Sequence, residues 1–99
     1  MTTSPIEVRT PFAQSVSVGE DLLSVALIDG RVLLVPLAWY PRLAAATVAE
    51  RSNWRLIGRG EGIHWPDIDE DLSVAALLAG HGSTETQGSL KRWLETRRR

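Results

Sequence analysis

Apolar and polar residues alternate in the first third of the chain in the way that β-strands require. The alternation runs from Ser15 to Val18, and two longer apolar runs follow at Leu22 to Ile28 and Arg31 to Val35. Asp29-Gly30 joins these two runs, and this dipeptide tolerates the positive φ angles of a two-residue type I′ turn. The pattern therefore predicts a short strand followed by an antiparallel hairpin.

A two-residue turn also determines which side chains of the hairpin share a face, because successive side chains of a strand point to opposite sides. We expect one face to carry Leu23, Val25, Leu27, Val32 and Leu34. We expect the other face to carry Leu22, Ala26, Ile28, Leu33 and Val35. Since both faces are apolar, a helix or another chain is expected to cover part of each.

A helical segment is predicted at residues 37–51, which begin after Pro36 and carry alanines at positions 44, 45, 46 and 49. Pro41 suits a first helical turn, where its missing N–H costs nothing. Thr47-Val48-Ala49-Glu50 has the spacing of a capping box, in which the Thr hydroxyl and the Glu carboxylate accept from free backbone N–H groups. We therefore expect the helix to break near Ala46 or Thr47.

Residues 54–57 (Trp-Arg-Leu-Ile) have strand character and are predicted to add a strand to the hairpin. Gly58, Gly60 and Gly62 then alternate, which permits the close approach of another backbone or a bulge. Trp39, Trp54, Trp65 and Tyr40 are large enough to dominate a small core, and we expect them to lie mostly inside it.

Two short helices are predicted in the last quarter of the chain. Ser73 is a suitable N-cap for a helix from Val74 to Ala79, and Gly80 suits the position after its end. The polar residues 81–88 form a linker. Residues 89–99 then place Leu90, Trp93 and Leu94 on one helical face, with a basic opposite face.

These elements predict an α+β fold: a small antiparallel sheet, made of the hairpin plus added strands, with a broken helical segment packed on one face and short C-terminal helices. We expect an N-terminal arm at 1–14, the α+β domain at 15–80, and the polar linker with its basic amphipathic helix at 81–99. The chain has 99 residues, no cysteine and no long apolar run, so we expect no disulfide, no membrane span and a cytoplasmic location.

The formal net charge of −1 hides an uneven distribution of charge. Residues 1–80 contain 6 Arg and 10 Asp or Glu, whereas residues 81–99 contain 5 Lys or Arg and 2 Glu. Cations that contact phosphates would make nucleic-acid affinity depend strongly on salt, and Trp93 could stack on a base. The residues of this alternative function are Lys91, Arg92, Arg97, Arg98 and Arg99.

Three motifs resemble one known family: W-Y-P-R-L at Trp39 to Leu43, N-W-R-L-I-G at Asn53 to Gly58, and G-I-H-W-P-D-I-D-E-D-L-S-V at Gly62 to Val74. Together they resemble the prokaryotic domain of unknown function family 2442. The resemblance implies a small α+β domain and no established reaction, cofactor or catalytic residue. It also implies a gene beside that of another small protein, an arrangement similar to toxin–antitoxin pairs.

His64 is the residue that most invites a catalytic interpretation. A carboxylate from Asp67 or Asp69 could fix its tautomer and raise its basicity, giving an acid/base pair. Catalysis would also need a nucleophile or a metal, and the sequence supplies neither in a recognisable pattern. The acids at 67–71 do not match a calcium loop and are better explained by attraction to the start of the next helix. We therefore expect no catalytic residue, no cofactor and no metal site.

The favoured function is a non-enzymatic protein-interaction module, such as the antitoxin-like or regulatory member of a two-protein system. Its partner would be another small protein, encoded nearby, or a second copy of the chain. A nucleic-acid-binding accessory protein is the first alternative, and a small hydrolase or transferase centred on His64 is the second. The residues expected to contact a partner are His64, Trp65, Asp69, Leu90, Trp93 and Leu94.

Overall fold

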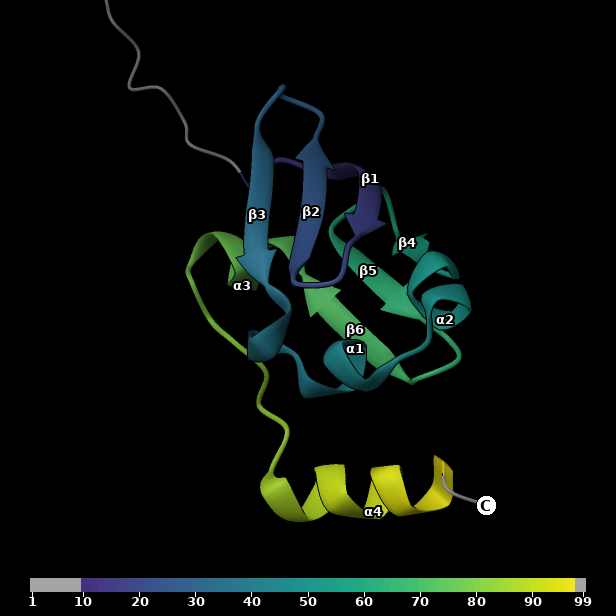
Figure 1. The fold of residues 1–99 in the computed structure, drawn as a ribbon. Coiled ribbons are helices and arrows are strands. Elements are labelled where there is room, and N and C mark those ends of the chain that lie inside the picture. Colours follow the sequence, from purple (N-terminus) through teal and green to yellow (C-terminus); the bar gives the residue numbers. More distant parts are fainter. Residues whose placement is uncertain (1–9, 98–99) are drawn as a thin grey trace, which may run out of the picture.

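The computed structural model describes residues 10–97, which form an α+β fold with two antiparallel three-stranded sheets and several short helices (Figure 1). This confirms the predicted fold class. Most of the predicted N-terminal arm lies outside the described residues. Sheet A has the order β1-β2-β3 and consists of β1 (Ala13–Val18), β2 (Leu22–Leu27) and β3 (Val32–Pro36). Sheet B has the order β4-β5-β6 and consists of β4 (Arg55–Ile57), β5 (Gly62–Trp65) and β6 (Glu70–Ser73).

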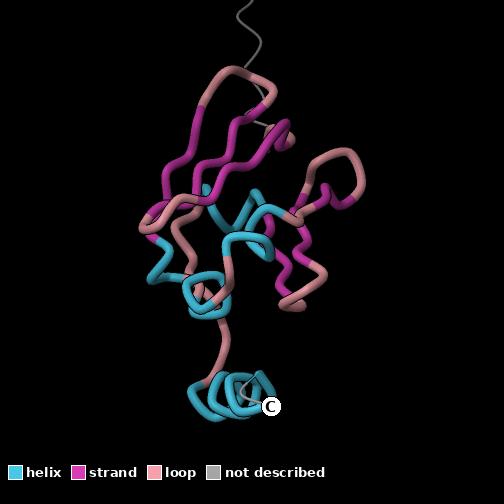
Figure 2. The backbone as a smooth tube through the Cα atoms, turned by 45° about the vertical axis from the view of Figure 1, so that its right-hand side comes forward, coloured by secondary structure: helices cyan, strands magenta, loops and turns pink. Residues whose placement is uncertain are grey.

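Short helices connect and follow the sheets, and the last helix lies apart from the others (Figure 2). They are η1 (Leu37–Trp39, a 3-10 turn), α1 (Pro41–Ala45), α2 (Val48–Ser52), α3 (Val74–Leu78) and α4 (Gln87–Arg97). None of them is long and apolar enough to cross a membrane, as far as the described residues extend.

The predicted break in the helical segment is confirmed. Ala46 is extended, with ψ 156°, and separates α1 from α2. The capping box forms at the start of α2: Glu50 N–H donates to Thr47 Oγ1 at 3.1 Å, and Thr47 N–H donates to Glu50 Oε1 at 2.8 Å. Pro41 occupies the first turn of α1, as its fixed φ angle allows.

The caps of α3 are confirmed as well. Ser73 Oγ accepts from Ala76 N–H at 3.3 Å, which satisfies a free backbone donor at the helix start. Gly80 has φ +79° after the helix end, and His81 N–H donates back to Ala76 O at 2.9 Å. These bonds close the helix in the manner of a Schellman motif.

The hairpin turns where predicted, but the predicted type I′ turn is wrong. Gly30 N–H donates to Leu27 O at 3.1 Å, and Leu27 N–H donates to Arg31 O at 2.8 Å, so the loop has three residues instead of two. Gly30 has φ +94°, while Asp29 is not among the described residues with positive φ. A type I turn closed by a glycine bulge has this geometry.

The extra loop residue changes the register, and the predicted faces of β3 are therefore wrong. Val25 pairs with Leu33 and Leu23 pairs with Val35, so the odd-numbered residues of both strands face the core. Val32 and Leu34 face outward instead. A shift of one residue reverses every side chain of a strand, because the side-chain period is two.

The predicted addition of residues 54–57 to the hairpin is also wrong, because β4 pairs with β5 in the separate sheet B. The strand β6 was predicted only as an acidic approach to α3. The two sheets meet where Ala13 N–H donates to Gly60 O at 2.7 Å. A Cβ on Gly60 would lie 2.4 Å from Ala13 O, so the expected close backbone approach occurs at this glycine.

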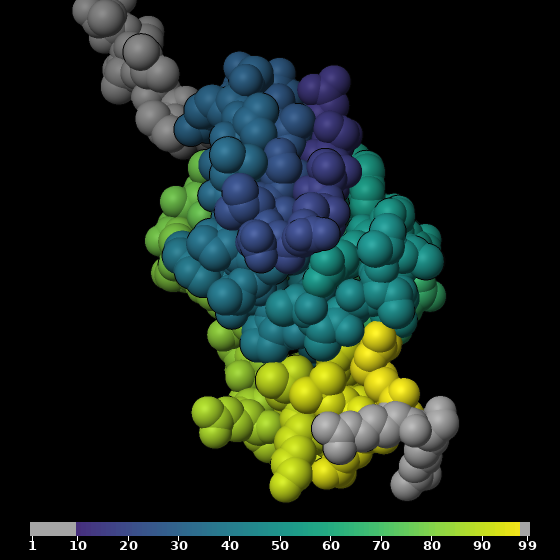
Figure 3. All heavy atoms as spheres, in the orientation of Figure 1, coloured from purple at the N-terminus to yellow at the C-terminus, as the bar shows by residue number. Residues whose placement is uncertain are grey.

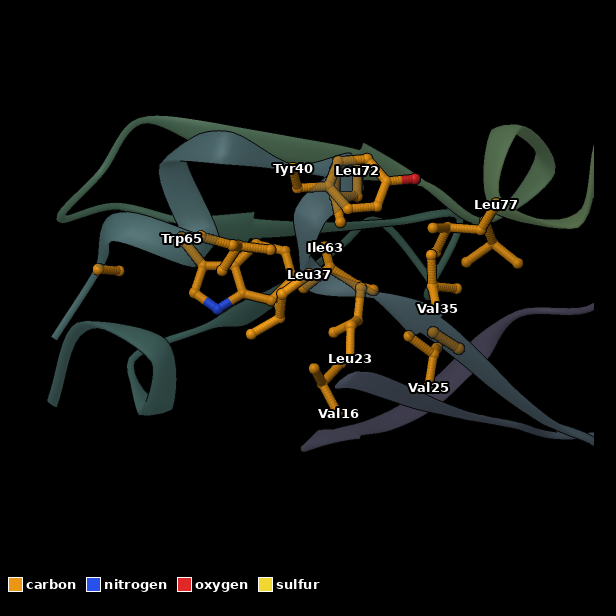
Figure 4. Close-up of a cluster of buried hydrophobic side chains, with 14 of the residues drawn as sticks. Val16, Leu23, Val25, Val35, Leu37, Tyr40, Ile63, Trp65, Leu72 and Leu77 are labelled. Atoms are coloured by element: carbon orange, nitrogen blue, oxygen red, sulfur yellow. The ribbon is translucent and has the colours of Figure 1, made fainter. Parts of the chain in front are cut away.

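The core lies between the two sheets and the short helices, and Figure 4 shows side chains from both sheets pointing toward one another. Trp65 is fully buried, and its Nε1–H donates to Arg51 O at 3.1 Å. Tyr40 is buried as predicted and Trp54 is partly buried. Trp39 is 40% exposed, so its predicted place in the core is wrong.

Candidate interaction surfaces

His64 lies on the exposed face of sheet B. We call this face the His64 surface, and its residues are Arg55, Ile57, His64, Asp71 and Ser73. Strand pairing puts Arg55, His64 and Asp71 in one row across the sheet, and Ile57, Gly62 and Ser73 in the next. His64 Nδ1 is hydrogen-bonded to Asp71 Oδ1. Since a carboxylate on one ring nitrogen fixes the ring orientation, the dyad is a rigid polar feature on an open surface.

The partner of His64 is therefore Asp71, and the predictions of Asp67 or Asp69 are wrong. Asp67 Oδ2 accepts from Asn53 Nδ2 at 2.9 Å, and Asp69 is an exposed turn residue with φ +50°. The β5–β6 hairpin places position 71 opposite position 64. Recognising residues 66–69 as a hairpin turn would have found this pair from the sequence.

The groove beside His64 combines charged, hydrogen-bonding and apolar groups. The adjoining open groove has a volume of about 500 Å³ and is lined by Arg55, Leu56, Ile57, His64 and Asp71. These side chains supply a cation, a dyad and an apolar wall, but no hydroxyl or thiol nucleophile. Within residues 10–97, no three His, Cys, Asp or Glu side chains are grouped so that they could hold a metal ion.

A second polar cluster lies on the other side of β6 and includes Glu70, Arg42 and Glu85. The sequence did not indicate this cluster. Burial raises the pKa of the Glu70 carboxyl group to about 7, although the Arg42 guanidinium opposes this shift. A cavity of about 200 Å³ beside it is lined by Tyr40, Glu70 and the linker after α3. Tyr40 Oη donates to His81 O at 2.9 Å, which ties the linker to the domain.

Helix α4 docks on the domain through Trp93. Two guanidinium groups lie over the ring, with Arg42 Cζ at 5.1 Å and Arg97 Cζ at 4.6 Å from its centroid. Arg97 also donates to both carboxylate oxygens of Glu50, at 2.9 and 2.6 Å. The hydrogen bonds from Arg97 lower the pKa of Glu50 to about 2. Figure 3 shows α4 beneath the domain body, in contact with it.

The apolar face of α4 is only partly used in this contact. Leu90 and Leu94 are half-buried and line a shallow groove of about 190 Å³ with Gln87, Lys91 and Glu95. No side chain of α4 is fully buried. Among the predicted nucleic-acid contacts, Lys91 and Arg92 are exposed, Arg97 is engaged with Glu50 and Trp93, and Arg98 and Arg99 lie outside the described residues.

The largest exposed apolar side chains of the β-structure gather on the outer side of sheet A. Leu22, Val32 and Leu34 share this outer face by strand register, and Ile28 lies in the adjoining hairpin loop. Their exposed fractions are 45%, 56%, 63% and 59%, respectively. We call these four residues the outer apolar patch. The sequence indicated two apolar faces, but the predicted register assigned Val32 and Leu34 to the wrong one.

The residues predicted to contact a partner do not form one surface. His64 lies on the His64 surface, Asp69 lies in the turn before β6, and Leu90, Trp93 and Leu94 belong to α4. Trp65 points into the core, where a partner could not touch it.

The comparisons with known proteins agree with this fold. The family described as "Protein of unknown function (DUF2442)" matches residues 13–83, which is more than half of the chain. The chain belongs to this family. The DUF2442 match ends before α4 begins, so this helix lies outside the part that the family describes.

A solved structure resembles this DUF2442 protein over most of its length. It is the crystal structure of a protein of unknown function from Rhodospirillum rubrum, with a TM-score of 0.66 and 27% sequence identity. The likeness covers 76% of this chain and 93% of the other. No curated protein matches.

Proposed function

We propose that this DUF2442 protein is a cytoplasmic, non-enzymatic protein-interaction module, the antitoxin-like or regulatory member of a small two-protein system. The observation that carries the proposal is the outer apolar patch. Four large apolar side chains, each 45–63% exposed, lie together on one side of a small domain. Several exposed apolar side chains on one face of a domain mark a contact site for other proteins, whereas single exposed apolar residues need no explanation.

The His64 surface supports the same proposal, because its polar groups are suited to binding a partner. The His64–Asp71 dyad lies in an open groove whose lining includes no hydroxyl or thiol, and the nearby Ser73 hydroxyl caps α3, so the dyad is suited to hydrogen-bonding a partner. The absence of cysteine from the sequence suits a reducing compartment. The partner we propose is the small protein encoded beside this chain.

The test is co-expression of the tagged chain with the protein encoded by the adjacent gene, followed by gel filtration of the purified pair. We expect a stable complex with the native chain and a complex at least tenfold weaker with Leu34→Lys, because the new charge would have to be desolvated in the interface. Val48→Lys is the matched control, since Val48 is 78% exposed on α2, away from the patch. Binding that Leu34→Lys leaves intact would contradict the proposal.

A further inference from the structure

In the part of the chain that the structure describes, no strand pairs with the outer edge of β3. This strand is the last strand of sheet A, and the edge lies on the left of Figure 1. Because Leu27 N–H donates to Arg31 O, the alternation of an antiparallel ladder turns the N–H and C=O groups of Val32 and Leu34 away from β2. Within residues 10–97, no backbone hydrogen bond joins these two residues to another element.

The middle of this edge carries none of the charges that usually prevent strands from adding to it. Natural edge strands carry lysines, inward-pointing charges, prolines or bulges, whereas β3 has the sequence VLLVP with no charge, its proline at the last position and its glycine bulge in the loop before the strand. The adjacent loop contains Asp29 and Arg31, and these two neutralise one another through a salt bridge of 2.9 Å. Two identical edges can therefore approach without repulsion between like charges.

We propose that a second copy of the chain pairs with this edge, so that two β3 strands run antiparallel about a two-fold axis and join two A sheets into one six-stranded sheet. Val32 of each copy exchanges both backbone hydrogen bonds with Leu34 of the other. Leu33 lies opposite its own copy. The proposal uses the same observation as the proposed function, the outer apolar patch, but assigns that patch to a second copy instead of the neighbouring protein.

The register follows from which backbone groups are free. Pairing Val32 with Leu34 of the copy satisfies all the outward-facing groups of both residues at once. It places Pro36 opposite Gly30 of the copy. This pair leaves no backbone N–H without a hydrogen bond, because Pro36 has no N–H and the Gly30 N–H already donates to Leu27 O.

The side chains fit the same register. Val32 and Leu34 of the two copies meet on the outer face as two cross-strand apolar pairs. In this register, the hairpin loop of one copy, which carries Ile28, lies beside the end of β3 in the other copy. At that end, Leu22 pairs with Pro36 within the same chain. All four residues of the outer apolar patch therefore lie along one continuous stripe. The contact is smaller than the usual ~800 Å² per partner, so we expect a dissociation constant on the order of 10 to 100 µM.

The first test is sedimentation equilibrium of the isolated full chain from about 5 to about 500 µM, a range that spans the affinity expected for so small a contact. We expect the apparent mass to rise from monomer to dimer. Leu34→Lys should remain a monomer, whereas Val48→Lys should dimerise like the native chain. A native chain that stays monomeric throughout, or a Leu34→Lys dimer of unchanged affinity, would overturn the inference.

The second test determines the register, and it uses the fact that the chain has no cysteine. Leu33→Cys should form an intermolecular disulfide on mild oxidation, because residues directly opposite have Cβ atoms about 5 Å apart. Val32→Cys and Leu34→Cys should each cross-link poorly alone, since identical positions would be diagonal neighbours about 7 to 8 Å apart. Mixed together, they should cross-link well. Efficient self-linking of either one, with none for Leu33→Cys, would refute this register.

A measurement on the native chain guards against a variant that fails to fold. Amide hydrogen exchange at Val32 and Leu34 should slow by roughly three- to sevenfold between the lowest and highest concentrations, in step with the fall in the monomer fraction, while Leu33 should change little. Unchanged exchange at Val32 and Leu34 would count against the pairing.

The same data separate this inference from the proposed function. A chain that is monomeric alone but whose Val32 and Leu34 amides become protected by the neighbouring protein would refute self-pairing and support the proposed function. A dimer that binds no neighbouring protein would do the reverse.

Discussion

Gly30 and Gly60 both have positive φ angles, +94° and +113°, but their surroundings differ. A Cβ at Gly30 would meet nothing within 4 Å, whereas one at Gly60 would lie 2.4 Å from Ala13 O. We predict that Gly30→Ala lowers the free energy of unfolding by about 1 kcal/mol, through backbone strain alone. Gly60→Ala should cost clearly more, because the backbones of the two sheets must also separate.

Urea unfolding of both variants measures this difference. Gly82→Ala is a suitable control, since a Cβ there would make only an ordinary contact of 3.5 Å with Trp39 O. Equal losses for Gly30→Ala and Gly60→Ala would mean that the contact between Ala13 and Gly60 is not close in solution.

Glu70 gives a prediction about pH. Burial raises its pKa from 4.5 to about 7, so the folded state binds the carboxyl proton more tightly than the unfolded state does. The resulting stabilisation is complete below pH 4.5 and is lost as pH rises through 7. We predict that Glu70→Gln, which cannot ionise, is more stable than the native chain at pH 8 and removes this part of the pH dependence.

Thermal unfolding between pH 5 and pH 8 measures the effect. Glu95→Gln is the matched control, because Glu95 is exposed on α4 and the charge change is the same. A parallel loss of stability in the native chain and in Glu70→Gln would exclude Glu70 as its source.

At the scale of single elements, α4 is held by charges and one aromatic ring. We predict that Glu50→Gln releases it, because the amide can still cap α2 but cannot form the ion pair with Arg97. In the native chain, Glu50 has a pKa of about 2 instead of 4.5. Its contribution to docking is therefore present above pH 4.5 and is lost as pH falls toward 2.

The indole N–H resonance of Trp93 reports this docking by NMR. At pH 7, Glu50→Gln should shift it toward its position in the isolated helix. About 1 M salt should shift it less in the native chain, because the ion pair is only partly exposed and salt screens such pairs less. The resonances of the other three tryptophans should not move. A Trp93 resonance that is insensitive to both changes would show that the ring is held by packing alone.

Local signals in the sequence predicted most elements correctly. The Thr47–Glu50 capping box, the Ser73 cap and the position of the hairpin all depend on residues within a few positions of one another. The predicted register of β3 was wrong because Asp29-Gly30 fits two turn types whose loops differ in length by one residue. The prediction of the acid that pairs with His64 was wrong for a related reason, since the turn at 66–69 determines which acid lies opposite His64.

At the scale of the whole molecule, the domain should not depend on α4. No α4 side chain is fully buried, and the family match ends at residue 83. We predict that deleting residues 87–99 lowers the free energy of unfolding by only about 1 to 2 kcal/mol, the usual combined size of one partly exposed ion pair and the cation–π contacts of one ring.

Urea unfolding and circular dichroism of the shortened chain provide the measurement. The bonds from Ser83 N–H to Trp39 O and from Tyr40 Oη to His81 O remain in this variant and hold the linker. A chain that no longer folds cooperatively would show that α4 belongs to the structural core.

The arrangement of strands into two sheets was beyond what the sequence alone could predict. Strand propensity identified residues 54–57 as β-structure, but which strands become neighbours depends on contacts between distant residues. The contact between Ala13 and Gly60 illustrates this, because no residue near Gly60 in the sequence indicates that Ala13 is its partner. The glycine predicted a close approach of another backbone but not which segment would supply it.

Each sheet is nevertheless a continuous meander: β1, β2 and β3 follow one another in sequence, and so do β4, β5 and β6. Within residues 10–97, every pair of adjacent strands is therefore formed by neighbours along the chain, and distant segments are joined by sheet packing and by the contacts of the linker and α4. Proteins rich in such short-range contacts fold faster than those whose strands pair across long loops. The two meanders can each begin to form while the chain is still being synthesised, which leaves their mutual docking as the late step.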